Sequence, residues 1–426
     1  MNLSTNKSIV IFLIFIQFQI VSQSFAQKAD DGLADNLYIN PYTIYDPTNY
    51  LTGSWGGVRD KLVESGITPT SNYFTTILGN PVGGDRQGLK YAGLLNAYLG
   101  FNLEKLLNID GTRFMISGSW ASGESLSEED IGNFFGVSNV FSGNSVRLYQ
   151  MFLRTDHFES RFNFAIGRMA IGDKFATLHL FNNYVSLAFN ENPVSLSLNN
   201  PGFFSNPQAS WGAWMRAKPF QDFYFLTGVY NSNPRLARDS AHGVDFSFRK
   251  GAIIIGEAVY QPYKKGGSSK KPGVFKLGAY YDTGKFARVA DDERTEEGNY
   301  GFYFIGEQII YREPNVTSQG LIAWGSVTLA PDEKINTFPF FLSGGMVYEG
   351  FLPSRDKDRT AIGITYGAVS EDLRGKDFEL LMELSYIFHL KKWLRIQPDI
   401  QYIVHPGGSG EIPNALVIGV QLGTNI

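Results

Sequence analysis

The amino-acid sequence predicts an all-β protein, a transmembrane antiparallel β-barrel of 16 strands with a short N-terminal helix and one or more loops folded inward. The first observation is a strict alternation of apolar and polar residues. It is clearest at 394–404, where one face of a strand suits hydrocarbon and the other suits water. The second is an export signal at the start of the chain. The third is length, because about 400 residues after that signal give roughly 25 for each of 16 strands with its connection.

The N-terminal residues have the pattern of a secretory signal peptide. Lys7 supplies a positive charge, residues 9–16 form an unbroken apolar run, and residues 24–26 place small side chains before a cleavage point. An uncleaved anchor helix is the alternative, but the run is shorter than a bilayer span of about 20 apolar residues. We therefore divide the chain into a cleaved signal peptide (1–26), a flexible polar segment (27–50) and the barrel (51–426).

The composition argues against several classes of protein. Cysteine is absent, so the chain has neither a disulfide framework nor a thiolate site, which suits an exported protein. The formal net charge of −4 is too small to indicate nucleic acid as a partner. Aromatic residues make up 15 % of the chain and there are 46 glycines, a composition typical of barrels. We expect no cofactor and no metal.

The elements of the predicted barrel follow one another from Trp55. Residues 55–65 have a helical pattern that Gly66 ends, and strands begin at Ile67. In the clearest strands the apolar residues face one way and the polar residues the other. Charges then lie in the lumen rather than in lipid, where a Lys or Arg at mid-bilayer costs about 2–4 kcal/mol. These strands are 91–104, 161–167, 209–218, 378–389, 394–404 and the last, 416–423.

Four irregular segments interrupt the strands: 121–143, 170–208, 262–272 and 285–298. The first two are too long for plain turns, and long loops in compact proteins usually have a function. We expect one of them to fold inward and narrow the lumen; a solvated surface loop is the alternative. The charged segment 285–298 and the Lys-, Gly- and Ser-rich run 264–272 are expected to be solvated loops.

Seven sequence blocks stand in an order that is typical of one family. The first, 51–67, holds a Trp-Gly-Gly-x-Arg signature followed by a short helix, and the second, 78–107, holds a Gly-Gly-x-Arg turn and the second strand. The other five are 146–153, 165–176, 228–234, 344–364 and 396–408. With these blocks the chain resembles the OprB-type carbohydrate-selective porins from about Leu51 to its end. Gln150 stands where that family usually has Glu.

The resemblance implies a 16-stranded barrel in the bacterial outer membrane. Such a protein passes small sugars, such as glucose-like monosaccharides, by facilitated diffusion through a constriction of arginines, other polar side chains and nearby aromatics. Its partners would be the permeating sugars and outer-membrane lipid, without nucleic acid. A monomer and a homotrimer both stay open.

A sugar is a ring of hydroxyl groups with apolar C–H faces, which decides what its site needs. Arginine offers five fixed donors, carboxylates accept from hydroxyls, and an aromatic ring stacks on the C–H face. Weak binding suffices, because conduction requires release. Alternation places on the lumen side Gln150, Arg154, Trp214, Arg216, Lys218, Glu257, Glu379, Glu383, Arg395, Asp399 and Gln401, and the family motifs add Arg59 and Arg86. The alternative for the arginines, Glu383 and Asp399 is a salt bridge in the wall, and for Trp214 an aromatic at the membrane interface.

Three other classes of protein stay open. A barrel enzyme needs a nucleophile with a base, but the five histidines show no metal-ligand spacing such as H-E-x-x-H, and no G-x-S-x-G occurs. A general porin, or one selective for anions or peptides, would be favoured by the lumen arginines, whereas the lumen acids oppose a strong preference for anions. A soluble β-sandwich or adhesin would need a second sheet to cover the apolar faces.

Overall fold

The computed structural model describes one compact unit, comprising residues 45–157, 161–189, 191–237, 242–244, 251–262, 273–314 and 319–426. The predicted signal peptide (1–26), most of the N-terminal segment (27–50) and the run 264–272 lie outside these residues.

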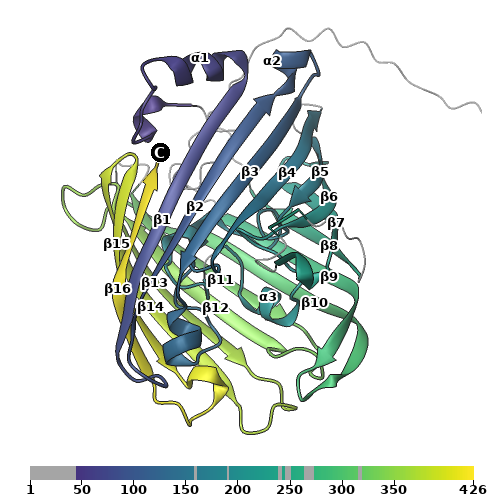
Figure 1. The fold of residues 1–426 in the computed structure, drawn as a ribbon, viewed down its shortest axis with the longest axis vertical. Coiled ribbons are helices and arrows are strands. Elements are labelled where there is room, and N and C mark those ends of the chain that lie inside the picture. The colour runs from purple at the N-terminus through teal and green to yellow at the C-terminus, as the bar shows by residue number, and fades with distance from the viewer. Residues whose placement is uncertain are drawn as a thin grey trace, which may run out of the picture. The chain divides into compact units, whose positions relative to one another are not determined.

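Sixteen antiparallel strands close into a barrel, as the alternating segments predict (Figure 1). Each strand pairs with its neighbours in the sequence, and β1 (Ile67–Val82) pairs with β16 (Ala415–Asn425) to complete the ring. The other strands are β2 (Leu89–Asn102), β3 (Thr112–Gly123), β4 (Ser145–His157), β5 (Phe162–Met169), β6 (Ser210–Ala217), β7 (Phe223–Asn231), β8 (Ala252–Tyr260), β9 (Gly273–Arg288), β10 (Asp291–Arg312), β11 (Gly320–Leu329), β12 (Phe340–Glu349), β13 (Arg359–Ala368), β14 (Phe378–Lys391) and β15 (Leu394–Val404).

Short helices precede the first strand and occupy several segments between strands. α1 (Val58–Ser65) is the predicted N-terminal helix, and Gly66, with a φ of 102°, ends it in a left-handed conformation that glycine adopts without steric cost. The other helices are α2 (Leu103–Leu107) and α3 (Ser195–Asn199), with single helical turns at Pro47–Asn49, Ser127–Ile131, His179–Asn183, Pro234–Ala237 and Pro406–Gly408. No helix in the described part of the chain is both long and apolar enough to cross a membrane.

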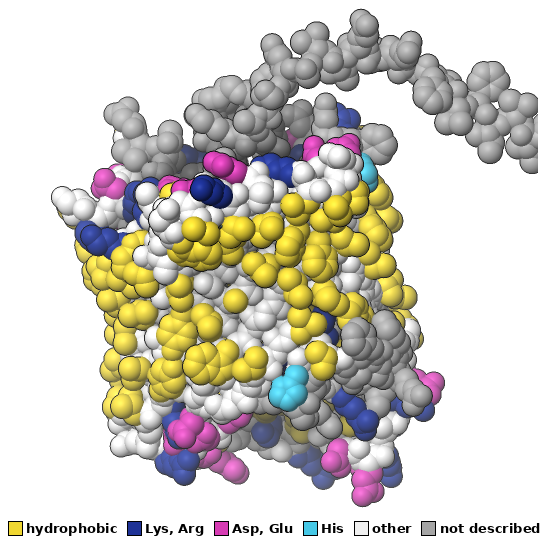
Figure 2. All heavy atoms as spheres, turned by 45° about the horizontal axis from the view of Figure 1, so that its top comes forward, with side chains coloured by type: hydrophobic (Ala, Val, Ile, Leu, Met, Phe, Trp, Pro, Cys, Tyr) yellow, Lys and Arg dark blue, Asp and Glu magenta, His cyan; other side chains and the backbone are white. Residues whose placement is uncertain are grey.

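The two faces of each strand differ as the alternation predicts. On β15, the outward Ile400 is 46 % exposed, whereas the inward Gln397 and Gln401 are fully buried. Figure 2 shows the outward apolar side chains as a band around the wall, with charged side chains gathered at its two rims. The band fits the hydrocarbon of a membrane and the rims fit its aqueous boundaries.

The two ends of the barrel carry connections of different length. The end with α1 and α2 in Figure 1 has the shorter connections, such as 218–222 and 392–393. The opposite end has the three longest, 124–144, 170–209 and 232–251. In outer-membrane barrels short turns face the periplasm and long loops face outward. We therefore call the two ends the periplasmic end and the outer end.

Two of the long connections, loop 124–144 and loop 170–209, fold into the barrel. Their largest apolar side chains are at most 1 % exposed and pack in one cluster with inward residues of the wall; they include Phe135, Phe175, Phe181, Tyr184 and Phe189. The predicted inward fold is therefore confirmed, and both loops adopt it. Because the loops fill much of the lumen, they decide where a solute can pass.

Tyr184 shows how closely loop 170–209 fits the wall. Its hydroxyl accepts a hydrogen bond from Trp324 Nε1 at 2.8 Å and donates one to the carbonyl of Ile362 at 3.0 Å. It lies against two glycines, one on β12 and one on β13. A Cβ atom on Gly345 would lie 2.4 Å from the Tyr184 hydroxyl oxygen, and one on Gly363 would lie 2.9 Å from its ring. These strands lack side chains where the loop needs the space.

The prediction of a solvated loop at 285–298 is wrong. These residues extend β9 and β10 into a long hairpin that turns at residues 289–290. Charged pairs cross this hairpin, such as Lys285 with Glu297 at 3.1 Å. The predicted strand 91–104 also differs in extent, since Asn102 ends β2 and its side chain caps α2.

Candidate permeation site

The inward loops are held by carboxylates of the wall. Glu383 on β14 accepts hydrogen bonds from the backbone N–H groups of Val185 at 2.7 Å and Ser186 at 2.9 Å. Four residues earlier on the same strand, Glu379 accepts from the N–H groups of Phe134 at 2.8 Å and Phe135 at 2.7 Å. A buried carboxylate is tolerated when such donors satisfy it. Glu379 and Glu383 therefore hold loops 124–144 and 170–209, respectively.

Glu257 on β8 holds the opposite side of loop 170–209. It accepts from the backbone N–H of Ala176 at 2.8 Å and from the Tyr303 hydroxyl at 2.9 Å, and Lys276 lies 3.6 Å from its other oxygen. Sequence alternation thus places Glu257, Glu379 and Glu383 correctly on the inner face, and the structure gives each of them a partner in a loop.

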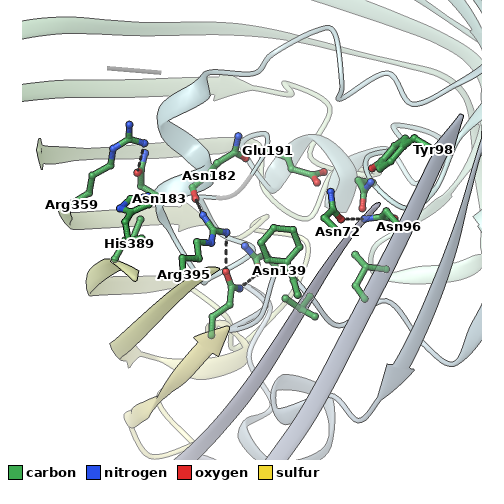
Figure 3. Close-up of a pocket in the computed structure, with 16 residues that line it drawn as sticks. Asn72, Asn96, Tyr98, Asn139, Asn182, Asn183, Glu191, Arg359, His389 and Arg395 are labelled. Carbon is green, nitrogen blue, oxygen red and sulfur yellow. Dashed lines mark hydrogen bonds between the residues drawn. The ribbon is translucent and has the colours of Figure 1, made fainter. Parts of the chain in front are cut away.

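A pocket stays open between the loops and one side of the wall (Figure 3). Its wall is built by β1, β2 and β13 to β16, and its remaining sides by the two inward loops. Six of the lining residues are asparagines, so we name it the amide pocket, and the others include two arginines and two aromatic rings. The lining residues are Asn72, Phe74, Leu94, Asn96, Tyr98, Asn139, Val140, Asn182, Asn183, Glu191, Asn206, Arg359, Ile387, His389, Arg395 and Gln421.

The asparagines suit the recognition of hydroxyl groups. Each side-chain amide offers two donors and an acceptor with two lone pairs, so that either role of a hydroxyl can be matched. Asn96 Nδ2 donates to Asn72 Oδ1 at 3.3 Å, and the Ser119 hydroxyl donates to Asn96 Oδ1 at 2.7 Å. These bonds fix the amides of β1 and β2 and leave them capacity for a solute.

Arg395 is the predicted arginine that lines this pocket. Its guanidinium donates to Gln421 Oε1 at 3.2 Å and to the carbonyl of Asn182 at 3.5 Å, and lies 4.9 Å from the ring centroid of Phe74. Among the described residues it makes no ion pair with a carboxylate. Gln421 in turn donates to Asn139 Oδ1 at 2.7 Å, which ties the arginine to loop 124–144. The pocket therefore combines fixed donors with an aromatic plate.

A second group of residues, which includes the predicted Arg154, Trp214 and Arg216, lies between β4 and β9. Four cations, which we name the basic wall, are gathered here: Arg154, Lys174, Arg216 and Lys276. Lys174 Nζ lies 4.5 Å from the ring centroid of Trp214, and the Arg154 guanidinium lies 5.8 Å from it. Arg216 lies 5.6 Å from the ring of Tyr224. Trp214 therefore faces the lumen, between cations, instead of the membrane interface.

Gln150 joins this wall to the inward loop. The side-chain amide of Gln150 and the hydroxyl of Tyr149 both donate to the carboxylate of Asp173, the tyrosine at 2.7 Å. Tyr149 also packs in one buried cluster with Tyr98, which lines the amide pocket. The basic wall and the pocket are therefore neighbouring parts of one lumen.

Arg59 lies outside the lumen. It is fully buried in α1, with its guanidinium 3.9 Å from the ring of Tyr50. It donates to the carbonyls of Pro69 at 2.9 Å, Gly53 at 3.2 Å and Ile426 at 3.0 Å. The structure thus gives Arg59 contacts that fasten the N-terminal segment to the seam between β1 and β16.

Four further predicted residues take other places. The side chain of Arg86 is 65 % exposed in the β1–β2 turn at the outer end and pairs with Asp130 at 2.7 Å. Lys218 follows β6 in a turn at the periplasmic end. Asp399 accepts from Gln401 Nε2 at 2.7 Å, and the same amide donates to the carbonyl of Val137. Asp399 and Gln401 thus belong to the contact between β15 and loop 124–144.

Sequence reasoning missed most of the pocket. Alternation on β2 does place Asn96 and Tyr98 on the inner face, as observed, but offers no reason to prefer them over other inward residues. Asn139, Asn182 and Asn206 lie on the inward loops, where no periodicity predicts the direction of a side chain. The abundance of asparagine in the two long loops is the signal that could have indicated them.

A model of the family described as "Carbohydrate-selective porin, OprB family" matches residues 86–426. The chain belongs to this family. It is 27 % identical to Porin B of Pseudomonas aeruginosa over 423 residues, which cover 88 % of this chain and 91 % of that protein. It is 23 % identical to a protein named putative porin QuiX of Acinetobacter baylyi, covering 88 % and 93 % of the two chains.

Solved structures agree with the family. The high-pH structure of Pseudomonas putida OprB matches with a TM-score of 0.82 at 24 % identity, covering 90 % of this chain and all of that one. Its low-pH structure matches with a TM-score of 0.61 at 22 % identity and the same coverage. The protein is therefore an outer-membrane porin of the carbohydrate-selective type, a channel and not an enzyme.

Proposed function

We propose that the protein conducts glucose-like monosaccharides by facilitated diffusion, and that the amide pocket binds them transiently on the way. The observation that supports this most strongly is the lining of the pocket, six asparagines beside the Arg395–Phe74 pair. Amides and a guanidinium match the hydroxyls of a sugar, and the rings of Phe74 and Tyr98 match its C–H faces.

The pocket also explains why binding would be weak enough for transport. Its amides already bond one another and the loops, so a sugar exchanges partners instead of filling empty ones. Conduction requires such moderate binding, because a tightly held solute would block the channel. We further propose that Gln150, Arg154, Trp214 and Arg216 line the adjoining part of the same path.

The test is swelling of proteoliposomes that contain the purified protein, with glucose, a disaccharide, an amino acid and a small anion as solutes. Faster uptake of glucose than of solutes of similar size supports a sugar-selective pore. Equal uptake of all small solutes would make the protein a general porin. No swelling by a barrel that keeps its heat-modifiable mobility in detergent gels would refute the proposed function.

The variant Arg395→Met tests the pocket itself. Since hydrogen bonds to a charged group are worth about 1.5–3 kcal/mol, the glucose concentration that half-blocks the ion current should rise by at least about tenfold. Arg288→Met is the matched control, because Arg288 pairs with Glu296 on the β9–β10 hairpin, away from the pocket. If glucose blocks the ion current equally in both variants, Arg395 does not contribute to sugar binding.

A further inference from the structure

The basic wall gathers more positive charge than the amide pocket. Arg154, Lys174, Arg216 and Lys276 come from β4, loop 170–209, β6 and β9 and face one region of the lumen. On β4 and β6 the neighbouring residues Leu153 and Met215 are 41 % and 43 % exposed on the outer face, so the two arginines point inward. Neutral hydroxyls can be bound by amides, as in the pocket, without gathering like charges.

The loop holds Lys174 in this group. One residue before it, Asp173 accepts from Tyr149 on β4, and two residues after it, Ala176 donates its N–H to Glu257 on β8. These two hydrogen bonds hold the loop so that the ammonium group of Lys174 lies 4.5 Å from the ring centroid of Trp214. Lys174 is only partly buried, so it reaches the water of the lumen.

Acids of the neighbouring elements lie among these cations. Asp156 pairs with Arg154 at 3.0 Å, Glu257 lies 3.6 Å from Lys276, and Asp173 is bound to Tyr149 and Gln150. Partial burial and the charges of Arg154, Arg216 and Lys276, acting together against the attraction of Glu257, lower the pKa of Lys174 to about 7. An anion beside Lys174 would relieve this repulsion.

We propose that the basic wall is a second binding site in the lumen, for the carboxylate of an acidic monosaccharide. The carboxylate would lie among Lys174, Arg154 and Arg216, and the hydroxylated ring would lie toward Trp214 and the amide pocket. The inference rests on the proposed function, since it extends the solutes of the same channel from neutral sugars to sugar acids.

The experiment measures block of the ion current through single channels in planar bilayers by galacturonate and by galactose, which differ in one carboxylate. Acetate serves as the anion without a ring. Galacturonate should block at lower concentration than galactose or acetate. Lys174→Met should weaken galacturonate block about fivefold, the size of one partly solvated ion pair, and leave galactose block nearly unchanged. Lys285→Met, on the exposed β9–β10 hairpin, is the control for loss of one charge.

Lys174→Arg separates a bound anion from a structural role of the lysine. Arginine keeps its charge at every pH used, so the variant should bind galacturonate equally at pH 6.5 and pH 8.5. The wild type should bind it more weakly at pH 8.5, because Lys174 has then lost its proton. Burial raises the pKa of Asp173 only to about 6, so this carboxylate is mostly ionised at both pH values. A pH dependence in Lys174→Arg as large as that of the wild type would refute the role of the Lys174 charge.

Equal block by galacturonate and galactose, or block by acetate as strong as by galacturonate, would refute the sugar-acid site. A galacturonate block that Lys174→Met leaves unchanged would also refute it. In each of these cases, block by galactose still supports the proposed function. Absence of block by any sugar, with conducting channels present, would refute the proposed function and this inference together.

Discussion

Replacing Glu383 with glutamine should loosen loop 170–209 without unfolding the barrel. The carboxylate accepts two backbone N–H groups, from Val185 and Ser186, at 2.7 and 2.9 Å. Glutamine keeps one acceptor oxygen and turns an NH₂ group toward the other donor. One buried N–H then lacks a partner, which costs about 1–3 kcal/mol. Local opening of the loop should become about 5- to 150-fold more frequent, whereas the strand hydrogen bonds stay in place.

Hydrogen exchange measured by mass spectrometry on the purified protein would detect this opening. Peptides that contain Val185 and Ser186 should exchange faster in Glu383→Gln, and a disaccharide should enter proteoliposomes faster, because the loop narrows the lumen. Glu296→Gln is the control, since Glu296 pairs with Arg288 on the exposed hairpin and holds no loop backbone. Unchanged exchange at Val185 and Ser186, in a variant that is otherwise folded, would show that Glu383 does not hold the loop.

Three more predictions follow from single contacts. Arg59→Lys should destabilise the seam by about 2–4 kcal/mol, since lysine cannot reproduce a forked set of donors, and should lower the temperature at which the gel mobility changes to that of the unfolded chain. An unchanged temperature would mean that the seam closes without this arginine. Arg86→Ala should change glucose uptake less than about twofold, because Arg86 is exposed at the outer end and the buried Asp130 keeps Lys90 at 3.7 Å; a larger change would place Arg86 on the solute path. Gly345→Ala should displace Tyr184 and raise exchange in the loop peptides, and exchange equal to wild type would contradict the close fit.

The wall of the barrel could be predicted from the sequence because each strand meets two different solvents. On β14, Glu379 and Glu383 alternate with Met382 and Leu384, so the inner and outer faces can be assigned residue by residue. Alternation fails where both faces of a strand meet water. The hairpin around residues 289–290 extends beyond the apolar band, carries charges on both faces and therefore has the composition of a loop.

The candidate site could be predicted only in part, because a side chain that points into the barrel does not necessarily contact the solute. Alternation cannot tell that Glu383 is covered by loop 170–209 whereas Arg395 borders an open pocket. That distinction depends on where two long loops lie, and their asparagines follow no period. Arg59 shows a different limit: a residue in a family motif can serve the assembly of the wall and not the passage of solute.

The glycines against Tyr184 connect the width of the channel with the composition of its wall. A loop residue of any other size would leave either a void above Gly345 and Gly363 or a clash with them. A change of pore width during evolution would therefore require paired substitutions, one in loop 170–209 and one on β12 or β13. Related porins with wider or narrower channels should differ at these strand positions as well as in the loop, and engineered pores made by loop exchange alone should conduct with heterogeneous currents.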